Sequence, residues 1–437
     1  MATQSPQAEP QPTAQPARFG LLGRTLGHSW SPRIHSTLGS APYALFEREP
    51  SDVADFVRNG SWQGINVTIP YKRDAAALAD EQSERVRRLG VANTLVRRAD
   101  GSIYADNTDV LGFSFMLDRF ARRHLGARVS ASEVLAGKKA LVLGTGGASQ
   151  AVQASLEDAG AQVVAISRTG TETYATLTSR HADAALLVNT TPVGMFPKCP
   201  ASPISADELA ALTGLVGVLD VVYNPERTGL MLDAARLGLP CESGLAMLVA
   251  QAFFASQLFQ GAKLEQELVD TIEQDIRKET RNVVFIGMPG CGKSAAGRKL
   301  ARLTRRPFVD LDDSFAIDHG ITPAACITER GEAAFRELET QTAADYCARS
   351  GLVIACGGGI VTQPRNFDIL HQNSTVVMLD RNLEELSSDG RPLSQAKGIE
   401  ALAAERMPLY RSWADIVLPC TGSSHGDAVA VRDLVGW

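Results

Sequence analysis

Short apolar runs alternate with longer amphipathic or charged stretches along most of the chain. Continuous apolar runs, such as Ala140–Leu143 and Val283–Ile286, are typical of parallel strands that are buried on both faces. Helical patterns occupy the stretches between these runs. The alternation predicts an α/β protein.

The part of the chain from Arg18 to about His124 predicts the first group of elements. We expect strands at Phe19–Leu22 and Gly64–Ile69, and a helix that begins at Ser31-Pro32. The other elements expected here are a charged helix from Pro70 to about Leu89, a hairpin of Asn93–Val96 and Ser102–Ala105 around Asp100-Gly101, and a long helix from Thr108 to about His124.

A second group begins at Lys139. Its expected strands are Ala140–Leu143, Gln162–Ile166, Leu186–Asn189 and Val216–Val221. The strongly apolar segment Ser243–Gln260 predicts a helix that returns to pack on the first group.

A charged helical stretch, 262–281, leads into the third group. Apolar residues recur there at every fourth position, as Leu264, Leu268, Ile272 and Ile276. We interpret it as a terminal domain helix that runs into a fusion joint, because the apolar stripe is too short for a dimerising coiled coil. The strands expected after it are 283–286, 307–310, 352–356, 375–379 and 415–418.

Composition excludes several classes of protein. A chain of 437 residues predicts two or three domains, and its net charge of −6 is spread without a basic face that would bind nucleic acid. No apolar run reaches the roughly 18 residues of a membrane span. The seven cysteines are scattered without C-x-x-C spacing, which favours a reducing, cytoplasmic setting over disulfides or structural zinc. Residues 1–17 are polar and predict a disordered tail.

A phosphate-binding pattern begins at Gly287. Strand Val283–Ile286 leads into a glycine-rich turn that contains Gly290 and Gly292, and Lys293-Ser294 then opens a helix. Glycines let backbone N–H groups surround an anion, the lysine reaches the outer phosphates, and the serine offers an oxygen to Mg²⁺. The segment therefore predicts an ATP site.

A second glycine turn follows the strand Ala140–Leu143 and predicts a dinucleotide site. The residues expected to hold the pyrophosphate are Gly144, Gly146, Gly147, Ala148 and Ser149. The next strand ends in Ser167-Arg168-Thr169, where an NAD site usually has an acidic residue. A guanidinium and two hydroxyls suit a 2′-phosphate, so NADP is the expected cofactor; the alternative is an ordinary surface arginine.

Three polar clusters lie upstream of this turn: His28–Pro32, Asn66–Lys72, and Asn93-Thr94 together with Asp106–Asp109. Each cluster alone is compatible with a helix cap or an Asx-turn. Together they closely resemble the clusters of shikimate dehydrogenase, and the resemblance runs from about Phe19 to Gln260.

This resemblance implies roles for individual residues. It places the substrate carboxylate on Ser29 and Ser31, the substrate hydroxyls on Thr68, Asn93 and Gln251, a further substrate contact on Tyr223, and the catalytic pair on Lys72 and Asp109. Hydride transfer to a ketone leaves an alkoxide that must be protonated, and a lysine beside a carboxylate can supply that proton. The neighbouring negative charge favours the ammonium form.

The third group holds further candidates for phosphoryl transfer. They are Asp310 and Asp312, which alternate along an extended segment and so can share a face, the glycines 357–359, and Arg336, Arg391 and Arg406. A lone arginine is more often on a solvated face, and a triple glycine can be a flexible turn. The set strongly resembles shikimate kinase over about residues 282–420.

On this second resemblance, Lys293 and Ser294 hold the ATP phosphates and Mg²⁺, and Asp310 supports the metal through water. Asp312 orients the acceptor hydroxyl and serves as its base. The groups that grip the small acid are Arg336, Arg406 and the backbone of Gly358–Gly359, while Arg391 belongs to the lid and neutralises the transferring charge.

The chain departs from the family patterns in three places. Ser167 stands where asparagine is more common, Gly229 stands where proline is common, and the short lid has Ser387-Ser388 in place of an Arg-Thr pair that flanks the adenine. The last departure bears on ATP affinity and on lid closure.

The two resemblances complement each other. The expected activities are reduction of 3-dehydroshikimate by NADPH and phosphorylation of shikimate by ATP. The expected domains are a substrate-binding domain at 18–110 completed by 243–260, an NADP domain at 111–242, a linker helix at 262–281 and a P-loop kinase domain at 282–437. The alternatives are an NAD-using quinate/shikimate dehydrogenase and a P-loop unit that senses a nucleotide without turnover.

Overall fold

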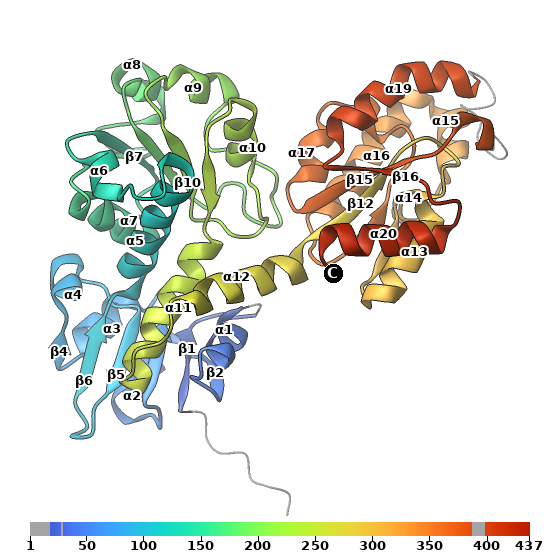
Figure 1. Ribbon diagram of the computed structural model, residues 1–437. Coiled ribbons are helices and arrows are strands. Elements are labelled where there is room, and N and C mark those ends of the chain that lie inside the picture. The colour runs from blue at the N-terminus through green and yellow to red at the C-terminus, as the bar shows by residue number, and fades with distance from the viewer. Residues whose placement is uncertain (1–17, 28, 387–397) are drawn as a thin grey trace, which may run out of the picture. The chain divides into compact units, whose positions relative to one another are not determined.

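The computed structural model describes residues 18–27, 29–386 and 398–437 of the chain, which contain three β-sheets with flanking helices (Figure 1). By their contacts these residues form two compact units. Unit 1 combines the described part of Met1–Gly112 with Val249–Val269, and unit 2 combines Phe113–Leu248 with Asp270–Trp437. The predicted α/β class is confirmed.

Unit 1 is built on a six-stranded mixed sheet in the order β2-β1-β3-β5-β6-β4. Its strands are β1 (Phe19–Gly23), β2 (Tyr43–Glu47), β3 (Gly64–Val67), β4 (Glu81–Gln82), β5 (Thr94–Arg97) and β6 (Ile103–Asp106). Its helices before the hairpin are α1 (Ser31–Thr37), α2 (Val53–Asn59), α3 (Lys72–Leu78) and α4 (Glu84–Leu89). The antiparallel β5–β6 hairpin is as predicted.

Two expectations for unit 1 are corrected. The single charged helix expected from Pro70 to Leu89 is two helices, because the chain turns into the edge strand β4 between them. Strand β2 was not expected at all. It lies at the opposite edge of the sheet and is only partly buried, so it lacks the continuous apolar run of a central strand.

Helix α11 (Leu245–Gln260) comes from a distant part of the sequence, and its residues from Val249 onward belong to unit 1. The Ser256 hydroxyl is hydrogen-bonded to that of Ser40, and the Phe259 ring stacks on Phe19 with 5.4 Å between the ring centres. A side chain at Gly64 would collide with the Phe259 ring, so β3 needs glycine where α11 crosses it.

The first sheet of unit 2 has five parallel strands in the order β11-β10-β9-β7-β8. These are β7 (Lys139–Leu143), β8 (Gln162–Ile166), β9 (Leu186–Asn189), β10 (Gly217–Asp220) and β11 (Cys241–Ser243). The α-helices of this part of the chain are α5 (Thr108–Phe120), α6 (Ala131–Leu135), α7 (Gly147–Asp158), α8 (Leu177–His181), α9 (Ala206–Ala211) and α10 (Gly229–Arg236). The first turn of α5 belongs to unit 1.

Helix α12 (Glu267–Thr280) precedes the last sheet. Of the predicted stripe, Ile272 and Ile276 are at most 3% exposed and form a packing face together with Val269, which was not predicted. Leu268 is only partly buried, and Leu264 lies before the helix begins. On the same helix, Glu273 accepts a hydrogen bond from the buried Arg119, which also binds Glu242 at 2.6 Å. Buried charges need such partners, and this network ties α12 to the first sheet of unit 2.

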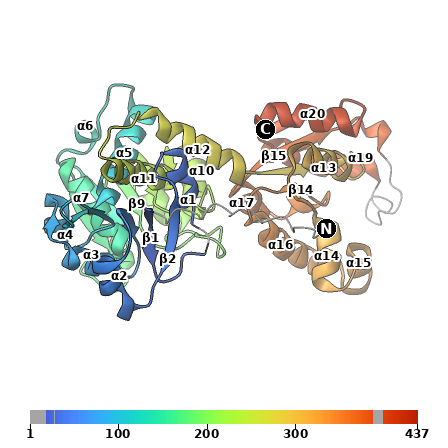
Figure 2. The same cartoon turned by 90° about the horizontal axis from the view of Figure 1, so that it is seen from below.

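The second sheet of unit 2 is also fully parallel, in the order β13-β14-β12-β15-β16. Its strands are β12 (Asn282–Ile286), β13 (Phe308–Asp310), β14 (Val353–Ala355), β15 (Ser374–Asp380) and β16 (Ile416–Pro419), each within two residues of its predicted position. Helices α13 (Lys293–Thr304) and α20 (Ser424–Val435) cover one face, and α16 (Glu332–Cys347) and α17 (Asn366–His371) cover the other (Figure 2). The remaining helices are α14 (Leu311–His319), α15 (Pro323–Arg330) and α19 (Ile399–Trp413).

Candidate active sites

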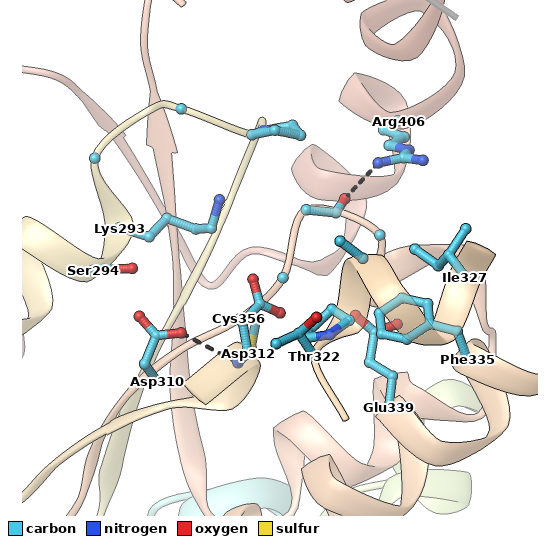
Figure 3. A pocket seen from close by; sticks show the side chains of 18 of the residues that line it. Lys293, Ser294, Asp310, Asp312, Thr322, Ile327, Phe335, Glu339, Cys356 and Arg406 are labelled. Atoms are coloured by element: carbon cyan, nitrogen blue, oxygen red, sulfur yellow. Dashed lines mark hydrogen bonds between the residues drawn. The ribbon is translucent and has the colours of Figure 1, made fainter. Parts of the chain in front are cut away.

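A cavity of about 590 Å³ lies at the carboxyl ends of β12, β13 and β14. Figure 3 shows Lys293, Ser294 and Asp310 on one side of it and Phe335 and Arg406 on the other. Ligands bind at this edge of open parallel sheets. The structure therefore brings together the residues that the sequence suggested for both phosphate binding and acid binding.

The phosphate loop has the backbone that its glycines permit. Gly287, Gly290 and Gly292 have φ values of 138°, 84° and 101°, which residues with a Cβ rarely adopt. The Lys293 ammonium donates to the carbonyl oxygens of Gly287 at 2.9 Å and Met288 at 3.0 Å. The lysine thus points into the loop, where an anion would meet both its charge and the N-terminus of α13.

Asp310 and Asp312 are close together for a different reason from the one expected. They do not alternate along an extended segment, because Asp310 ends β13 whereas Asp312 lies in the first turn of α14. The Asp310 carboxylate caps this helix by accepting a hydrogen bond from the Asp312 backbone N–H at 3.2 Å. The cap brings both carboxylates to the cavity.

Asp312 opens into the cavity, but protein atoms surround much of its carboxyl group. Burial raises the pKa of Asp312 above its usual value, and the negative charge of Asp310 raises it further. A carboxylate with a raised pKa is a stronger base than an ordinary aspartate, which suits proton abstraction from a hydroxyl.

Arg336 is held by a residue that the sequence analysis missed. Its Nη1 donates to Glu339 at 2.7 Å and its Nη2 to Glu332 at 3.1 Å. Burial raises the pKa of the Glu339 carboxyl, and the Arg336 guanidinium opposes this shift. The spacing of three residues on one helix, α16, is the signal that could have identified Glu339.

The triple glycine at 357–359 is a close-packed turn and not a flexible one. A Cβ on Gly357 would meet the carboxylates of Glu339 and Asp312, and a Cβ on Gly359 would overlap the Arg336 guanidinium at 2.1 Å. Arg406 donates to the Gly358 carbonyl at 3.2 Å, and the Tyr410 hydroxyl donates to the same oxygen.

Both arginines, Arg336 and Arg406, line the cavity, although they are only 4% and 2% exposed. A carboxylate fits two guanidinium groups well, so the pair favours an acidic ligand there. Arg391, Ser387 and Ser388 of the predicted lid lie outside the described residues, as does His28.

A second polar site lies in unit 1, around Lys72 and Asp109. The Lys72 Nζ lies 2.6 Å from Asp109 Oδ2, and the two side chains are 18% and 14% exposed. Lys72 opens α3, and Asp109 lies in the first turn of α5. The predicted pair is therefore formed, partly shielded from water and still open to a ligand.

The surrounding polar residues position this pair. The Asn93 side-chain oxygen accepts from the backbone N–H of Thr108 at 2.7 Å and so fixes the start of α5, which carries Asp109. Asn66, which the sequence analysis gave no role, accepts from the Tyr43 hydroxyl at 2.8 Å and donates to Thr94 at 3.2 Å. The bond to Thr94 joins the neighbouring strands β3 and β5, and the bond from Tyr43 links β3 to β2 across β1.

The other residues proposed for this substrate site also belong to unit 1. The Ser29 hydroxyl accepts from the Ser31 backbone N–H at 3.2 Å, and Ser31 is buried at the start of α1. Thr68 directly follows β3, and Gln251 lies on α11. Tyr223 belongs to unit 2, where burial raises the pKa of its hydroxyl.

The glycine turn after β7 fits an anion. Gly144 has a φ of 100°, and a Cβ added at Gly146 or Gly147 would have open space around it. Gly146 is the N-cap of α7, so its neighbouring N–H groups face that space. Ala148 follows in the first turn of α7, and at the end of β8 Ser167 is partly buried while Arg168 and Thr169 are exposed.

Ser149 supports the glycine turn. Its side chain is fully buried and its hydroxyl donates to the Gly144 carbonyl at 2.8 Å, and the contact with the cofactor expected of this residue stays a prediction. Ser149 therefore closes the turn from beneath. This bond gives a physical reason why serine is accepted where glycine or alanine is usual.

These two sites define a class of protein. A parallel sheet with a dinucleotide-type turn and a Lys–Asp pair is typical of a nicotinamide-dependent oxidoreductase, and a P-loop with a carboxylate-binding cavity is typical of a small-molecule kinase. Comparison with known proteins identifies the families. Residues 21–95 match the family model of the shikimate dehydrogenase substrate binding domain, and residues 289–433 match that of shikimate kinase.

Known proteins resemble the N-terminal part over almost their whole length. A shikimate dehydrogenase (NADP(+)) of Clostridium beijerinckii is 31% identical over 271 residues, which are 57% of this chain and 94% of that protein. One of Methylobacterium radiotolerans is 36% identical over 60% of this chain and 98% of that protein. The crystal structure of a chorismate mutase/shikimate 5-dehydrogenase fusion protein from Clostridium acetobutylicum matches with a TM-score of 0.53 and 30% identity, over 60% of this chain and 97% of that one. The chain belongs to the shikimate dehydrogenase family and carries a shikimate kinase domain in its C-terminal part.

No helix among the described residues is both long enough and apolar enough to cross a membrane. Within the same residues, no cluster of three or more His, Cys, Asp or Glu side chains forms a metal-binding group.

Proposed function

We propose that the protein is a bifunctional enzyme that reduces 3-dehydroshikimate to shikimate with NADPH and then phosphorylates shikimate with ATP. The observation that carries the proposal is the presence, in one chain, of the Lys72–Asp109 pair and of a P-loop cavity with two buried arginines. The product of the first reaction is the acceptor of the second. Both sites bind a small hydroxylated acid, so both need groups that bind a carboxylate and hydroxyls.

In the first reaction, Lys72 donates a proton to the oxygen of the ketone as it becomes an alcohol. Asp109 holds the ammonium group in place through the 2.6 Å contact and keeps it charged. Ser29 and Ser31 bind the carboxylate, and Thr68, Asn93, Gln251 and Tyr223 bind the hydroxyl groups. NADPH supplies the hydride.

The residues present fit NADP. The open space at Gly146 and Gly147 accepts a pyrophosphate at the N-terminus of α7, and Arg168 presents an exposed guanidinium at the end of β8. No acidic side chain precedes it at Ser167, so nothing there repels a 2′-phosphate.

In the second reaction, Asp312 accepts the proton of the shikimate hydroxyl that attacks ATP. Arg336, Arg406 and the backbone of Gly358–Gly359 bind the carboxylate and orient the ring. Lys293 and the N–H groups of the phosphate loop, including those of Gly287, Gly290 and Gly292, stabilise the phosphates, and Arg391 neutralises the charge in transfer. Ser294 and Asp310 are the oxygen donors that would hold Mg²⁺, and they fit because it prefers hard oxygen ligands.

The domains divide this work. Residues 18–110 with 243–260 bind the substrate of the reduction, 111–242 bind NADP, 262–281 join the two enzymes and 282–437 form the kinase. We propose a cytoplasmic location, since all seven cysteines are free thiols, a state that a reducing compartment maintains.

The test is a coupled assay on the whole chain with 3-dehydroshikimate, NADPH and ATP-Mg²⁺, in which NADPH loss and ADP release are followed together. Asp312→Asn should abolish most ADP release and leave NADPH loss unchanged. The control is Asp313→Asn, because Asp313 lies in the same turn of α14 with a side chain that is 71% exposed. ADP release that survives Asp312→Asn, or that does not require shikimate, would overturn the assignment of the kinase.

A further inference from the structure

Asp220 is a fully buried carboxylate at the carboxyl end of β10, the strand that leads to Tyr223. Its two oxygens accept four hydrogen bonds from three donor groups. The Asn189 amide donates to both oxygens at 3.0 and 3.1 Å, the Val222 backbone N–H donates at 2.9 Å, and the Thr228 hydroxyl donates at 2.7 Å.

These donors belong to the loops that follow two neighbouring strands. Asn189 ends β9 and lies opposite Asp220 in the register of the sheet. Val222 starts the loop after β10, and Thr228 ends the same loop as the N-cap of α10. Asp220 therefore fixes both ends of the 221–228 loop and the start of the 189–195 loop.

The network continues to the glycine turn. The Asn189 side-chain oxygen accepts from the backbone N–H of Thr191 at 3.0 Å and from its hydroxyl at 2.7 Å. The Thr190 hydroxyl donates to the Leu143 carbonyl at 2.7 Å, immediately before Gly144. A Cβ on Gly144 would lie 2.9 Å from the Thr191 methyl group, so this loop packs directly against the turn.

We propose that Asp220 is a positioning residue for the NADP(H) site, which holds the glycine turn, the 189–195 loop and the 221–228 loop in the arrangement that the cofactor requires. The proposal rests on the proposed binding of NADP(H) to this unit. Asp220 contacts protein groups on all sides and acts through the three loops.

The charge state of Asp220 should control this positioning. Burial raises the pKa of Asp220 to about 7, and the hydrogen bonds from Val222, Thr228 and Asn189 only partly offset that effect. On the neighbouring strand β11, Cys241 lies opposite Val218 and Glu242 lies opposite Leu219. Burial raises the pKa of the Cys241 thiol, which favours its neutral form, and Glu242 is paired with Arg119. Only the ionised carboxylate can accept all four bonds, because protonation turns one oxygen into a donor that faces other donors.

The experiment compares the whole chain with its Asp220→Asn variant by titration calorimetry of NADP⁺, from about pH 5.5 to about pH 8.5. The asparagine resembles a protonated aspartate in shape and charge. We expect the variant to bind about tenfold more weakly at the alkaline end and nearly equally at the acid end. The phosphate of NADP⁺ also titrates in this pH range, but it affects both proteins equally. The ratio of the two dissociation constants therefore cancels its contribution.

Two controls keep the test decisive. Asp183→Asn alters an exposed carboxylate of the same sheet region, with a side chain 71% exposed, and should leave the ratio at one. Thermal unfolding of the same sample, followed by circular dichroism, reports whether the variant chain is folded. If Asp220→Asn does not fold, Thr228→Val removes a single donor and should weaken NADP⁺ binding in the same direction.

A ratio of dissociation constants near one at every pH would overturn the proposal. A ratio that differs from one but does not change with pH would also overturn it, because a carboxylate with only a structural role would change stability without this pH profile. If the natural chain itself binds no NADP⁺, the proposed function fails instead. The two failures are thus distinguishable.

Discussion

The Nη1 atom of Arg336 lies 2.7 Å from Oε2 of Glu339, and each side chain is 5% exposed. The pair lies on one face of α16, where the guanidinium also fills the space that a side chain at Gly359 would need. A buried charge is stable there only because its partner is present. Glu339 thus sets the direction in which Arg336 meets an acidic substrate.

Glu339→Gln should raise the KM for shikimate by about tenfold or more and leave the KM for ATP nearly unchanged. The amide removes the negative charge that holds Arg336. The guanidinium then keeps only Glu332 as a charged partner, and the Glu332 side chain is 41% exposed. Loss of one partner of a buried ion pair also costs about 3–5 kcal/mol of stability. Steady-state kinetics and thermal unfolding measure the two effects.

Glu337→Gln is the matched control. Glu337 lies on the same helix, is 53% exposed and pairs with Arg365 on the surface. Its replacement should change neither KM nor unfolding, because exposed pairs contribute about 1 kcal/mol at most. An equal effect of both substitutions would contradict the role given to Glu339.

Lys72→Ala should lower the turnover number of the dehydrogenase by about 10²–10⁴-fold, the usual contribution of a general acid. Binding of 3-dehydroshikimate should change far less, since Ser29, Ser31 and the hydroxyl-binding residues remain. NADPH oxidation measures both constants. Kinase activity of the same preparation provides an internal control for folding.

The exposed neighbour Arg73 supplies the comparison, and Arg73→Ala should leave NADPH oxidation unchanged. A Lys72→Ala variant with near-normal turnover would remove Lys72 from the mechanism. A variant with a normal turnover number but greatly raised KM would assign it to binding instead.

Local patterns in the sequence accounted for the central strands and the phosphate loop. Strand Asn282–Ile286 is apolar from Val283 onward, and Gly287, Gly290 and Gly292 are needed for positive φ values, so both features were readable from neighbouring residues. The Lys72–Asp109 pair was found through family resemblance, because the two residues are 37 positions apart and meet only in the fold.

The features that escaped prediction depend on contacts across the fold. Asp220 meets Asn189 because β9 and β10 pair in one particular register, which no local pattern specifies. Strand β4 interrupts a helical pattern because Glu81 and Gln82 pair with β6 at the edge of the sheet. In these cases tertiary pairing overrides the local signal.

His35 should make the chain less stable as the pH falls. It is fully buried, stacks on Tyr43 at 4.1 Å between ring centres, and burial lowers its pKa from 6.5 to about 3. Below about pH 6.5 the unfolded chain binds a proton that the folded chain does not, so stability falls by up to about 1.4 kcal/mol per pH unit from this group until the pH approaches its folded pKa.

His35→Gln removes this titration and should flatten the decline of unfolding temperature between about pH 6.5 and pH 4. The exposed His425 on α20 offers a control, since His425→Gln should leave the decline as it is. Parallel curves for the natural chain and His35→Gln would show that His35 takes up its proton in the folded state as well.

Arg306 should stabilise the joint between the two enzymes. Its guanidinium donates to the carbonyls of Glu279 at 3.0 Å and Arg281 at 3.1 Å, and also to that of Lys278, all at the C-terminal end of α12. The Trp437 ring covers it at 3.7 Å. The last carbonyls of a helix have no partners within the helix, so a cation there satisfies them and favours the helix dipole.

Arg306→Ala should therefore cost about 1–3 kcal/mol of stability, whereas Arg305→Ala next to it should cost little because that side chain is exposed. The same contacts bear on where the kinase can be separated from the dehydrogenase. A fragment that begins at residue 282 lacks all three carbonyls, so it should unfold at a lower temperature than one that begins upstream of Lys278. Equal unfolding temperatures for the two fragments would show that the Arg306 contacts add nothing to the kinase itself.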